Sequence, residues 1–587
     1  MVQHARSAND ALLNIALGGF GATALTAALL RGAASVAAFI AGLPAPTGGP
    51  ASGLAAVFTA ADPGGAVGAP GLNPFLYWGV VVVLLSACGA ILVWGWRVFR
   101  GVRERNEVHN IPGTASADEI RRVASAKALL SRAKTLRPSL GQRVTAPDLG
   151  YLLGTAKREP VWATVEDSVL LIGPPRSGKG LHIVINAILD APGAVITTST
   201  RPDNLTATIT AREAIGPVAV FDPQQLVPGL PSGLRWSPVR GCQDPLTAMI
   251  RAKGLASATG FGGVSDASFW EGKTTAAIQA LLHAAALDGL STKMLYQWAL
   301  NPTSAADAVR ILFTHPDAAD GWAESLDSMI QADPRTRDSI WQGVSLAFSA
   351  LADPRVLTAV SPSPDEEFDP VEFLRNRGTL YLLATGAGAG ASSALVAAFV
   401  EDLVETARKI AARSAGARMD PPMLLALDEI GNLAPLPSLP TLMAEGGGTG
   451  ITTLPVLQSL AQAREKWGDN NANAIWDASI VKIILGGASN SRDLQDIATL
   501  IGDRDETTYS TTTDAGGGRS AQSSIRRVPI LPPDALRTLP FGTGVVMLRS
   551  ARPIITRLRA WPTRPDAQLL KTQKAAVEAQ MGGDEPQ

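Results

Sequence analysis

The sequence predicts an α/β protein with a mostly parallel sheet, an inserted all-α domain and two amino-terminal transmembrane helices. Short apolar runs end in glycine-rich or acidic segments, which is typical of buried parallel strands. The stretch from residue 222 to 377 has helical spacing without strand patterns, and two long apolar segments precede residue 97. With 587 residues, the chain has room for roughly two to four domains.

The first 100 residues are predicted to form a membrane anchor. Segments 11–30 and 74–96 are each long enough to cross the hydrocarbon core, and aromatic residues flank the second. The loop 44–73 has no Lys or Arg, whereas four arginines follow residue 96 closely. The positive-inside rule then places both termini and all later domains in the cytoplasm. A cleaved signal peptide is the alternative for the first segment.

A basic juxtamembrane linker is predicted at residues 101–147. Between Arg97 and Arg143 the chain has eleven Lys or Arg against four Asp or Glu, with apolar residues at helical spacing. The basic face could meet anionic lipid, or it could help to grip a polyanion. The sequence leaves both interpretations open.

A glycine loop between an apolar strand and a helical pattern is the first chemical signal. The strand covers residues 169–172, and the loop consists of Gly173, Pro174, Pro175, Arg176, Ser177, Gly178, Lys179 and Gly180. Glycines let backbone N–H groups approach a triphosphate closely, and the lysine ammonium can reach its β- and γ-phosphates. Because Gly180 replaces the usual Ser or Thr, the shell of the Mg²⁺ that accompanies ATP must be completed differently. A plain glycine turn is the structural alternative.

The second chemical signal lies some 250 residues further on, where the apolar run 423–427 ends in Asp428 and Glu429. A buried parallel strand would deliver both carboxylates at its carboxyl end. There Asp428 would hold Mg²⁺, and Glu429 would orient and deprotonate the attacking water. The alternative is a helix N-cap.

Further apolar runs extend the predicted sheet, and the nucleotide-binding domain is assigned to residues 148–239 and 371–565. The runs cover residues 195–198, 218–221, 379–385, 452–460 and 480–487. Gln458 follows one of them at the sheet edge that also carries Lys179, so it could sense the γ-phosphate. An ordinary surface glutamine is the alternative.

The remaining segments give weaker signals. Residues 240–370 are predicted to be an inserted all-α domain, residues 506–527 a flexible loop, and residues 566–587 a disordered tail. Net charge is −1, so bulk charge gives no evidence for nucleic acid. The two cysteines, Cys88 and Cys242, indicate neither a zinc site nor a disulfide framework.

These features together resemble the type IV coupling proteins of bacterial conjugation and type IV secretion, the TraG-like membrane-anchored ATPases. The sequence is most similar to their actinobacterial branch, and GKG in place of GKS or GKT is common in that family. The motifs that carry the resemblance are the two spans, GPPRSGKG, AVFDP at 219–223, WSP at 236–238, the insert with Phe269-Trp270, LALDEIGNLAPLPSL at 424–438, and VLQS at 456–459.

The resemblance implies a RecA-like motor domain in a homohexamer at the bacterial cytoplasmic membrane. It implies ATP and Mg²⁺ as cofactors, with Lys179, Asp428, Glu429 and Gln458 at the nucleotide site. Implied partners are single-stranded DNA with a bound relaxase, and the type IV secretion channel proteins. The insert would recognise the substrate.

The sequence departs from the family in one loop. Many relatives carry a basic residue there that can act as an arginine finger, but this chain has glycine at residues 446–448. Arg464 and Arg492 are the alternatives, although each could be an ordinary surface charge. Two other functions also remain open: a membrane receptor for secreted proteins with weak ATPase activity, and a double-stranded DNA segregation pump.

Overall fold

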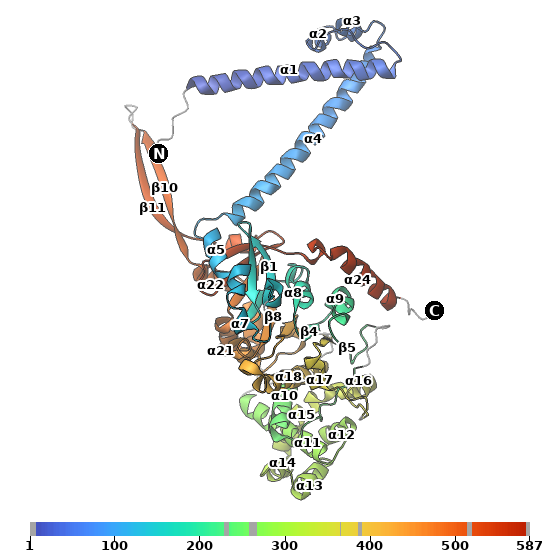
Figure 1. Ribbon diagram of the computed structural model, residues 1–587, viewed down its shortest axis with the longest axis vertical. Coiled ribbons are helices and arrows are strands. Elements are labelled where there is room, and N and C mark those ends of the chain that lie inside the picture. Colours follow the sequence, from blue (N-terminus) through green and yellow to red (C-terminus); the bar gives the residue numbers. More distant parts are fainter. Residues whose placement is uncertain are drawn as a thin grey trace. The chain divides into compact units, whose positions relative to one another are not determined.

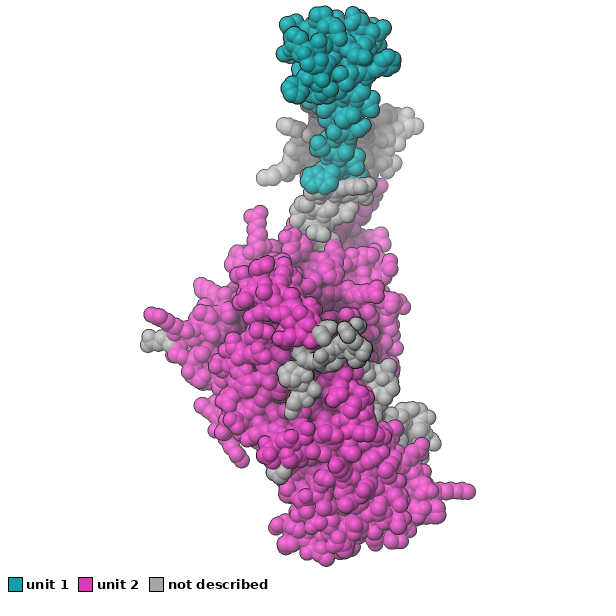
Figure 2. Space-filling view, turned by 90° about the vertical axis from the view of Figure 1, so that its right-hand side faces the viewer, with its two compact units in different colours: residues 1–107 teal, residues 108–587 magenta. Residues whose placement is uncertain are grey.

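The computed structural model describes residues 8–141, 143–227, 234–257, 267–363, 365–384, 390–513 and 519–582. They form two compact units, residues 1–107 and residues 108–587, shown as a ribbon in Figure 1 and by colour in Figure 2. Each unit has its own hydrophobic core. The nucleotide-binding motifs all lie in the second unit.

The first unit contains two helices that are long and apolar enough to cross a membrane. Its helices are α1 (Ala8–Ile40), α2 (Ser52–Phe58), α3 (Pro63–Val67) and α4 (Pro74–His109), with apolar windows at Thr23–Ile40 and Pro74–Trp96. Helix α1 continues beyond residue 30, the end expected for the first span, to Ile40. The Arg31 guanidinium donates hydrogen bonds to the carbonyl oxygens of Gly48 (2.6 Å) and Pro46, so this charged side chain of α1 has polar partners in the loop that follows the helix.

The second unit is built on one eleven-stranded sheet of order β2-β1-β13-β12-β9-β3-β8-β7-β4-β6-β5. Its parallel part runs from β9 to β5 and consists of the strands that the apolar runs predict. Their bounds are β3 (Val169–Ile172), β4 (Val195–Ser199), β5 (Val218–Phe221), β6 (Thr379–Leu383), β7 (Met423–Leu427), β8 (Ile451–Leu457) and β9 (Val481–Leu485). Residue 385, the last of one predicted run, lies outside the described residues. The α/β expectation is confirmed.

An antiparallel extension of the sheet was not predicted. Strand β12 (Thr543–Leu548) pairs antiparallel with β9, and β13 (Ile554–Leu558), β1 (Gly150–Ala156) and β2 (Glu159–Thr164) follow outward. Helices connect these strands and cover the sheet. They include α8 (Ile185–Asp190), α9 (Asp203–Glu213), α19 (Ile430–Leu433), α20 (Leu439–Glu445), α21 (Leu460–Ala478), α22 (Ser491–Ile501) and α23 (Pro533–Arg537).

The predicted linker at 101–147 is largely part of the nucleotide-binding domain. Its helices α5 (Ala117–Val123), α6 (Ala126–Leu130) and α7 (Ala133–Leu136) bury apolar side chains in one core with β1 and β3. Several of its basic residues pair internally, as Arg132 does with Glu166 and Arg137 with Asp420. The charges of these two arginines are therefore paired within the fold, and the lipid and polyanion interpretations of the basic segment stay predictions.

Between β5 and β6 the described residues form helices. They are α10 (Pro245–Ala256), α11 (Ala267–Leu287), α12 (Thr292–Leu300), α13 (Ala306–Thr314), α14 (Trp322–Ile330), α15 (Pro334–Ala347), α16 (Pro354–Ala359) and α17 (Pro370–Arg375). Most of them gather at the lower end of Figure 1, next to α18. Helix α10 packs on α18 (Gly390–Ala412), and Gly254 permits this because an added Cβ would lie 2.9 Å from the Cα of Ala398.

A buried polar cluster joins this helical insert to α18. Arg251 of α10 forms an ion pair with Asp402 of α18, and both side chains are buried. The Trp236 indole N–H donates to the other Asp402 carboxylate oxygen (3.0 Å), and the ring stacks on Phe399 (4.6 Å between centroids). Arg251 also donates to the Pro238 carbonyl oxygen (2.9 Å). Every charged or polar head in the cluster therefore has a partner.

Two segments expected to be irregular contain regular elements in their described residues, which leave out residues 514–518 and 583–587. Residues expected to form a flexible loop instead build an antiparallel ribbon, β10 (Asp503–Thr513) with β11 (Arg519–Pro529). Their repeated Thr and Ser side chains suit a solvated strand pair, which explains why composition alone misled. The expected disordered tail contains helix α24 (Ala567–Gly582), because Leu570 and Val577 pack on the apolar face of α9. Residues 583–587 lie outside the described part.

Candidate nucleotide-binding site

The glycine loop joins the carboxyl end of β3 to a helix, as its sequence predicts. It continues into a π-helical turn, η2 (Gly180–Val184), and then α8. Gly178 has φ +89°, and a Cβ there would lie 2.6 Å from the His182 ring, so only glycine fits. The Ser177 hydroxyl oxygen is buried without a hydrogen-bond partner among the described residues. The loop therefore holds an unused polar group as well as open backbone donors.

Lys179 lies at the start of the helix and faces its own loop. Its ammonium donates hydrogen bonds to the carbonyl oxygens of Gly173 (2.8 Å) and Pro174 (3.3 Å). It also lies 3.9 Å from a carboxylate oxygen of Glu429. Residues 250 positions apart in the chain thus meet at one point, because β3 and β7 end at the same edge of the parallel sheet.

Asp428 lies at the end of β7, on the floor of the site. Its carboxylate accepts a hydrogen bond from the Asn204 side-chain amide (3.1 Å), and the Thr198 hydroxyl donates to its backbone carbonyl (2.7 Å). Burial, and secondly the charge of Glu429, raise the pKa of Asp428 to about 6. A nearby cation would relieve the cost of this buried negative charge.

Glu429 and Gln458 belong to a closed ring of hydrogen bonds. One Glu429 carboxylate oxygen accepts from the Gln458 amide (3.1 Å) and from the Asn432 amide (2.7 Å). Gln462 accepts from the Gln458 backbone N–H (2.9 Å) and donates to Asn432 (2.9 Å). Glu429 itself has φ +53°, an unfavourable conformation for a residue with a side chain. The ring holds the carboxylate in place despite this strain.

An open cleft of about 550 Å³ connects the glycine loop, Asp428 and Glu429, and its volume is within the range of roughly 300–1,000 Å³ that is usual for small-molecule sites. Gln458 contacts Glu429 but does not line this cleft. It is lined by residues 175–181 of the loop, Ile185, residues 199–201, Asp203, Asn204, Asp428, Glu429, Trp561 and Lys574. The last two come from the carboxyl-terminal segment, which sequence reasoning had assigned to no site. No sequence signal pointed to them, since only the packing of α24 on α9 brings them there.

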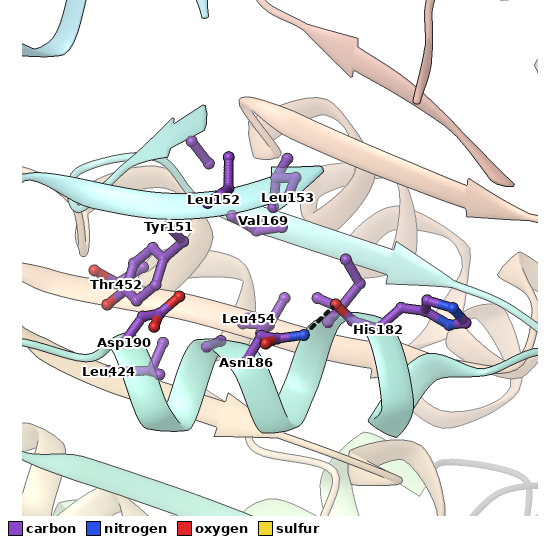
Figure 3. Close-up of a pocket in the computed structure, with 13 residues that line it drawn as sticks. Tyr151, Leu152, Leu153, Val169, His182, Asn186, Asp190, Leu424, Thr452 and Leu454 are labelled. Carbon is purple, nitrogen blue, oxygen red and sulfur yellow. Dashed lines mark hydrogen bonds between the residues drawn. The ribbon is translucent and has the colours of Figure 1, made fainter. Parts of the chain in front are cut away.

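A second, much smaller pocket lies behind the glycine-loop helix, between α8 and strands β1, β3 and β8 (Figure 3). Its volume is about 20 Å³, which holds at most a water molecule. Asn186 donates to the His182 carbonyl oxygen (3.0 Å) beside it, and also to that of Arg559 (2.7 Å). These bonds fix the helix on the sheet, so the cavity is structural.

The two arginines considered as finger residues differ in the structure. Arg464 forms an ion pair with Asp493, whose carboxylate also accepts the N–H groups of Leu460 and Ala461. Arg464 of α21 thus has a structural partner in α22. Arg492 is exposed on α22.

Packing explains the three consecutive glycines at residues 446–448, where many relatives carry a basic residue. A Cβ on Gly447 would lie 1.9 Å from the Glu166 carbonyl oxygen, and Arg418 bridges the Gly447 carbonyl oxygen (3.2 Å) and the Glu166 carboxylate. A basic side chain at position 447 would therefore require the backbone to move. The arginine finger remains unassigned.

Substituting Asp428 by Asn should stabilise the nucleotide-free protein by about 1–2 kcal/mol at pH 7. The raised pKa of Asp428 means that folding penalises its ionised form. The gain should be absent below pH 4, grow between about pH 4 and 6, and be constant above that range. Solvent in the cleft limits the size of this stability gain. Thermal melting across this pH range measures the gain. The control is Asp203→Asn, at the exposed mouth of the cleft, which should show no such pH trend; an equal trend in both variants would contradict the prediction.

Comparison with known proteins finds two matching family models. A family model described as "TraM recognition site of TraD and TraG" matches residues 422–541, and one described as "Type IV secretory system Conjugative DNA transfer" matches residues 119–231. The first range contains Asp428, Glu429 and Gln458, and the second contains the glycine loop. No curated protein matches the chain by sequence.

Solved structures with the same fold belong to the coupling protein TrwB. A bacterial conjugative coupling protein, TrwBdeltaN70, is 17% identical with a TM-score of 0.53 over 73% of this chain and 93% of that one. The plasmid coupling protein TrwB with ADP and Mg²⁺ is 16% identical, with a TM-score of 0.51 over 75% and 93%. TrwB with the ATP analogue ADPNP is 15% identical, again with a TM-score of 0.51 over 75% and 93%.

The parallel sheet, the glycine loop on β3 and the acidic pair on β7 define a P-loop nucleotide-binding protein with two apolar amino-terminal helices suited to a membrane anchor. Within that class, two family models match residues 119–231 and 422–541. Over these residues the chain is similar to the type IV coupling proteins, the TraG-like family of conjugative DNA transfer.

Proposed function

We propose that this protein is a membrane-anchored ATPase that drives single-stranded DNA, with its bound relaxase, through a type IV secretion channel. The observation that carries the proposal is the meeting of Lys179, Asp428 and Glu429 in one cleft at the sheet edge. The DNA-transfer family models cover both halves of that cleft. Both termini and the motor would lie in the cytoplasm, in agreement with the arginines that follow the second apolar helix.

The residues present fit ATP with Mg²⁺. The loop offers backbone N–H groups and the unpartnered Ser177 hydroxyl, and Asp428 offers a carboxylate whose buried charge a cation would compensate. The described residues contain no cluster of three or more His, Cys, Asp or Glu side chains. A single carboxylate suits Mg²⁺, which is commonly held by one or two protein carboxylates together with substrate phosphates. TrwB, which has the same fold, binds ADP with Mg²⁺ and an ATP analogue.

In this proposal each side chain has one task. Lys179 exchanges its contacts with the Gly173 and Pro174 carbonyl oxygens for contacts with the β- and γ-phosphates. Glu429, held by its hydrogen-bond ring, orients the attacking water and accepts its proton. Gln458 lies next to Glu429, where it can bond the γ-phosphate or that water. Mg²⁺, when bound, would neutralise charge on the phosphates.

The family resemblance supports a homohexamer in which the helical insert recognises the substrate. The insert is suited to relay a signal, because α10 is joined to α18 by the cluster of Arg251, Asp402 and Trp236. Helix α18 follows β6 of the motor sheet. Substrate contact at the insert can therefore reach the nucleotide-binding domain through packed elements.

Full-length protein in detergent should hydrolyse ATP faster when single-stranded DNA is added, and Lys179→Ala should abolish both rates. The reason is that the lysine ammonium supplies charge where the transferred phosphoryl group develops it. Phosphate release measures the rate, with the exposed Lys571→Ala as a matched control. Rates that survive Lys179→Ala would contradict the proposal.

The other two functions predict different results in the same assay. A receptor for secreted proteins would bind ATP but turn it over slowly whether or not DNA is present. A segregation pump would respond to double-stranded DNA more than to single-stranded DNA.

A further inference from the structure

The missing hydroxyl at Gly180 leaves a space in the P-loop that another residue fills. A Cβ built on Gly180 would lie 3.6 Å from the side-chain oxygen of Asn204, which is ordinary van der Waals contact. Apart from Gly180 itself, its two chain neighbours and the backbone of its own helical turn, no other described heavy atom comes within 4 Å of that position. A serine side chain would fit here without strain, so the glycine is not required by packing.

Asn204 presents its side-chain amide oxygen to the space beside Gly180. It is the second residue of α9, it is buried, and it lines the cleft. Its amide nitrogen donates to Asp428 (3.1 Å), since an ionised carboxylate can only accept hydrogen bonds. The amide oxygen must therefore point away from Asp428, toward Gly180.

We propose that Asn204 supplies, to the Mg²⁺ of bound ATP, the oxygen that a Ser or Thr hydroxyl at position 180 would otherwise supply. This inference rests on the proposed ATPase function and deepens it. Asn204 touches Asp428 on one side and the space beside Gly180 on the other, which are the two positions from which a P-loop protein holds this ion. Mg²⁺ accepts amide oxygen as a ligand, and a group already oriented by Asp428 loses little freedom on binding.

The chain offers a double substitution as a sharp test. Binding of a non-hydrolysable fluorescent ATP analogue to the full-length protein is measured with Mg²⁺ and with EDTA. The gain in affinity from Mg²⁺ is expected to fall about tenfold in Asn204→Ala, while the affinity in EDTA stays within about twofold of the original. Adding Gly180→Ser to Asn204→Ala should restore the gain, because the new hydroxyl enters the same space.

Three results would overturn the inference. They are an unchanged Mg²⁺ gain in Asn204→Ala, an equal loss of affinity with Mg²⁺ and with EDTA, and a loss that Gly180→Ser does not repair. The last result would mean that Asn204 only orients Asp428. Failure of the proposed function looks different. The unsubstituted protein would then show no saturable binding, or Lys179→Ala would bind the analogue as tightly as the unsubstituted protein.

Discussion

Replacing Glu429 by Gln should lower ATP turnover by about 10³-fold while leaving ATP binding intact. The substitution removes the base but keeps an oxygen that can accept from Gln458 or Asn432, so the hydrogen-bond ring and the strained backbone at φ +53° can persist. The phosphate contacts come from the glycine loop and Lys179, which do not change. Single-turnover hydrolysis and analogue binding, measured on the same preparation, separate the two effects.

Glu445→Gln is the matched control for this experiment. Glu445 is exposed at the end of α20, outside the cleft, so its neutralisation should leave turnover unchanged. If Glu429→Gln retained more than about a tenth of the original rate, Glu429 would not be the base. A parallel loss of binding would instead show that the ring had collapsed.

The largest loss of stability should follow from Arg251→Ala, at about 3–5 kcal/mol. The substitution leaves the Asp402 carboxylate buried with only the Trp236 N–H as a strong donor, and it frees the Pro238 carbonyl oxygen as well. A fall in melting temperature on the order of 10 °C is expected. Limited proteolysis should then cut first in the insert.

Two further variants show whether the buried charge is the cause. Arg240→Ala removes a partly exposed arginine whose ion pairs with Glu367 and Asp369 are 3.8 Å and 3.9 Å long, and it should change stability by less than about 1 kcal/mol. The double variant Arg251→Met with Asp402→Leu should recover much of the loss, because it leaves no unpaired charge. A loss in Arg251→Ala no larger than in Arg240→Ala would contradict the explanation.

The parallel half of the sheet was predictable because strands buried on both faces are continuous apolar runs. Each such run in the sequence corresponds to a strand, and the loop after β3 and the pair after β7 meet as expected. The antiparallel strands β1, β2, β12 and β13 are mostly buried, but Gly, Pro, Thr or Arg interrupts their apolar runs. The β10–β11 ribbon was missed for another reason, because its described side chains are mostly exposed. Its Thr and Ser residues look like loop composition when the pairing partner is unknown.

The supporting residues of the site were harder to foresee for a different reason. Asn432 and Gln462 follow Glu429 and Gln458 by three and four residues, a helical spacing that could have revealed them. Asn204 lies more than 200 residues from Asp428 in the chain, and Trp561 and Lys574 reach the cleft only because α24 covers α9. Such long-range juxtapositions leave no local pattern in the sequence.

The packing of α10 on α18 sets a limit on how this protein can be re-engineered. Because Gly254 lies against Ala398 and Arg251 is neutralised by Asp402, the boundary of the insert at residue 240 passes through a shared core. An insert cut out at residues 240–370 would expose Arg251 without its counter-ion and without Trp236. A chimaera that exchanges substrate preference between relatives would therefore have to transfer α18 and the segment around Trp236 together with the insert.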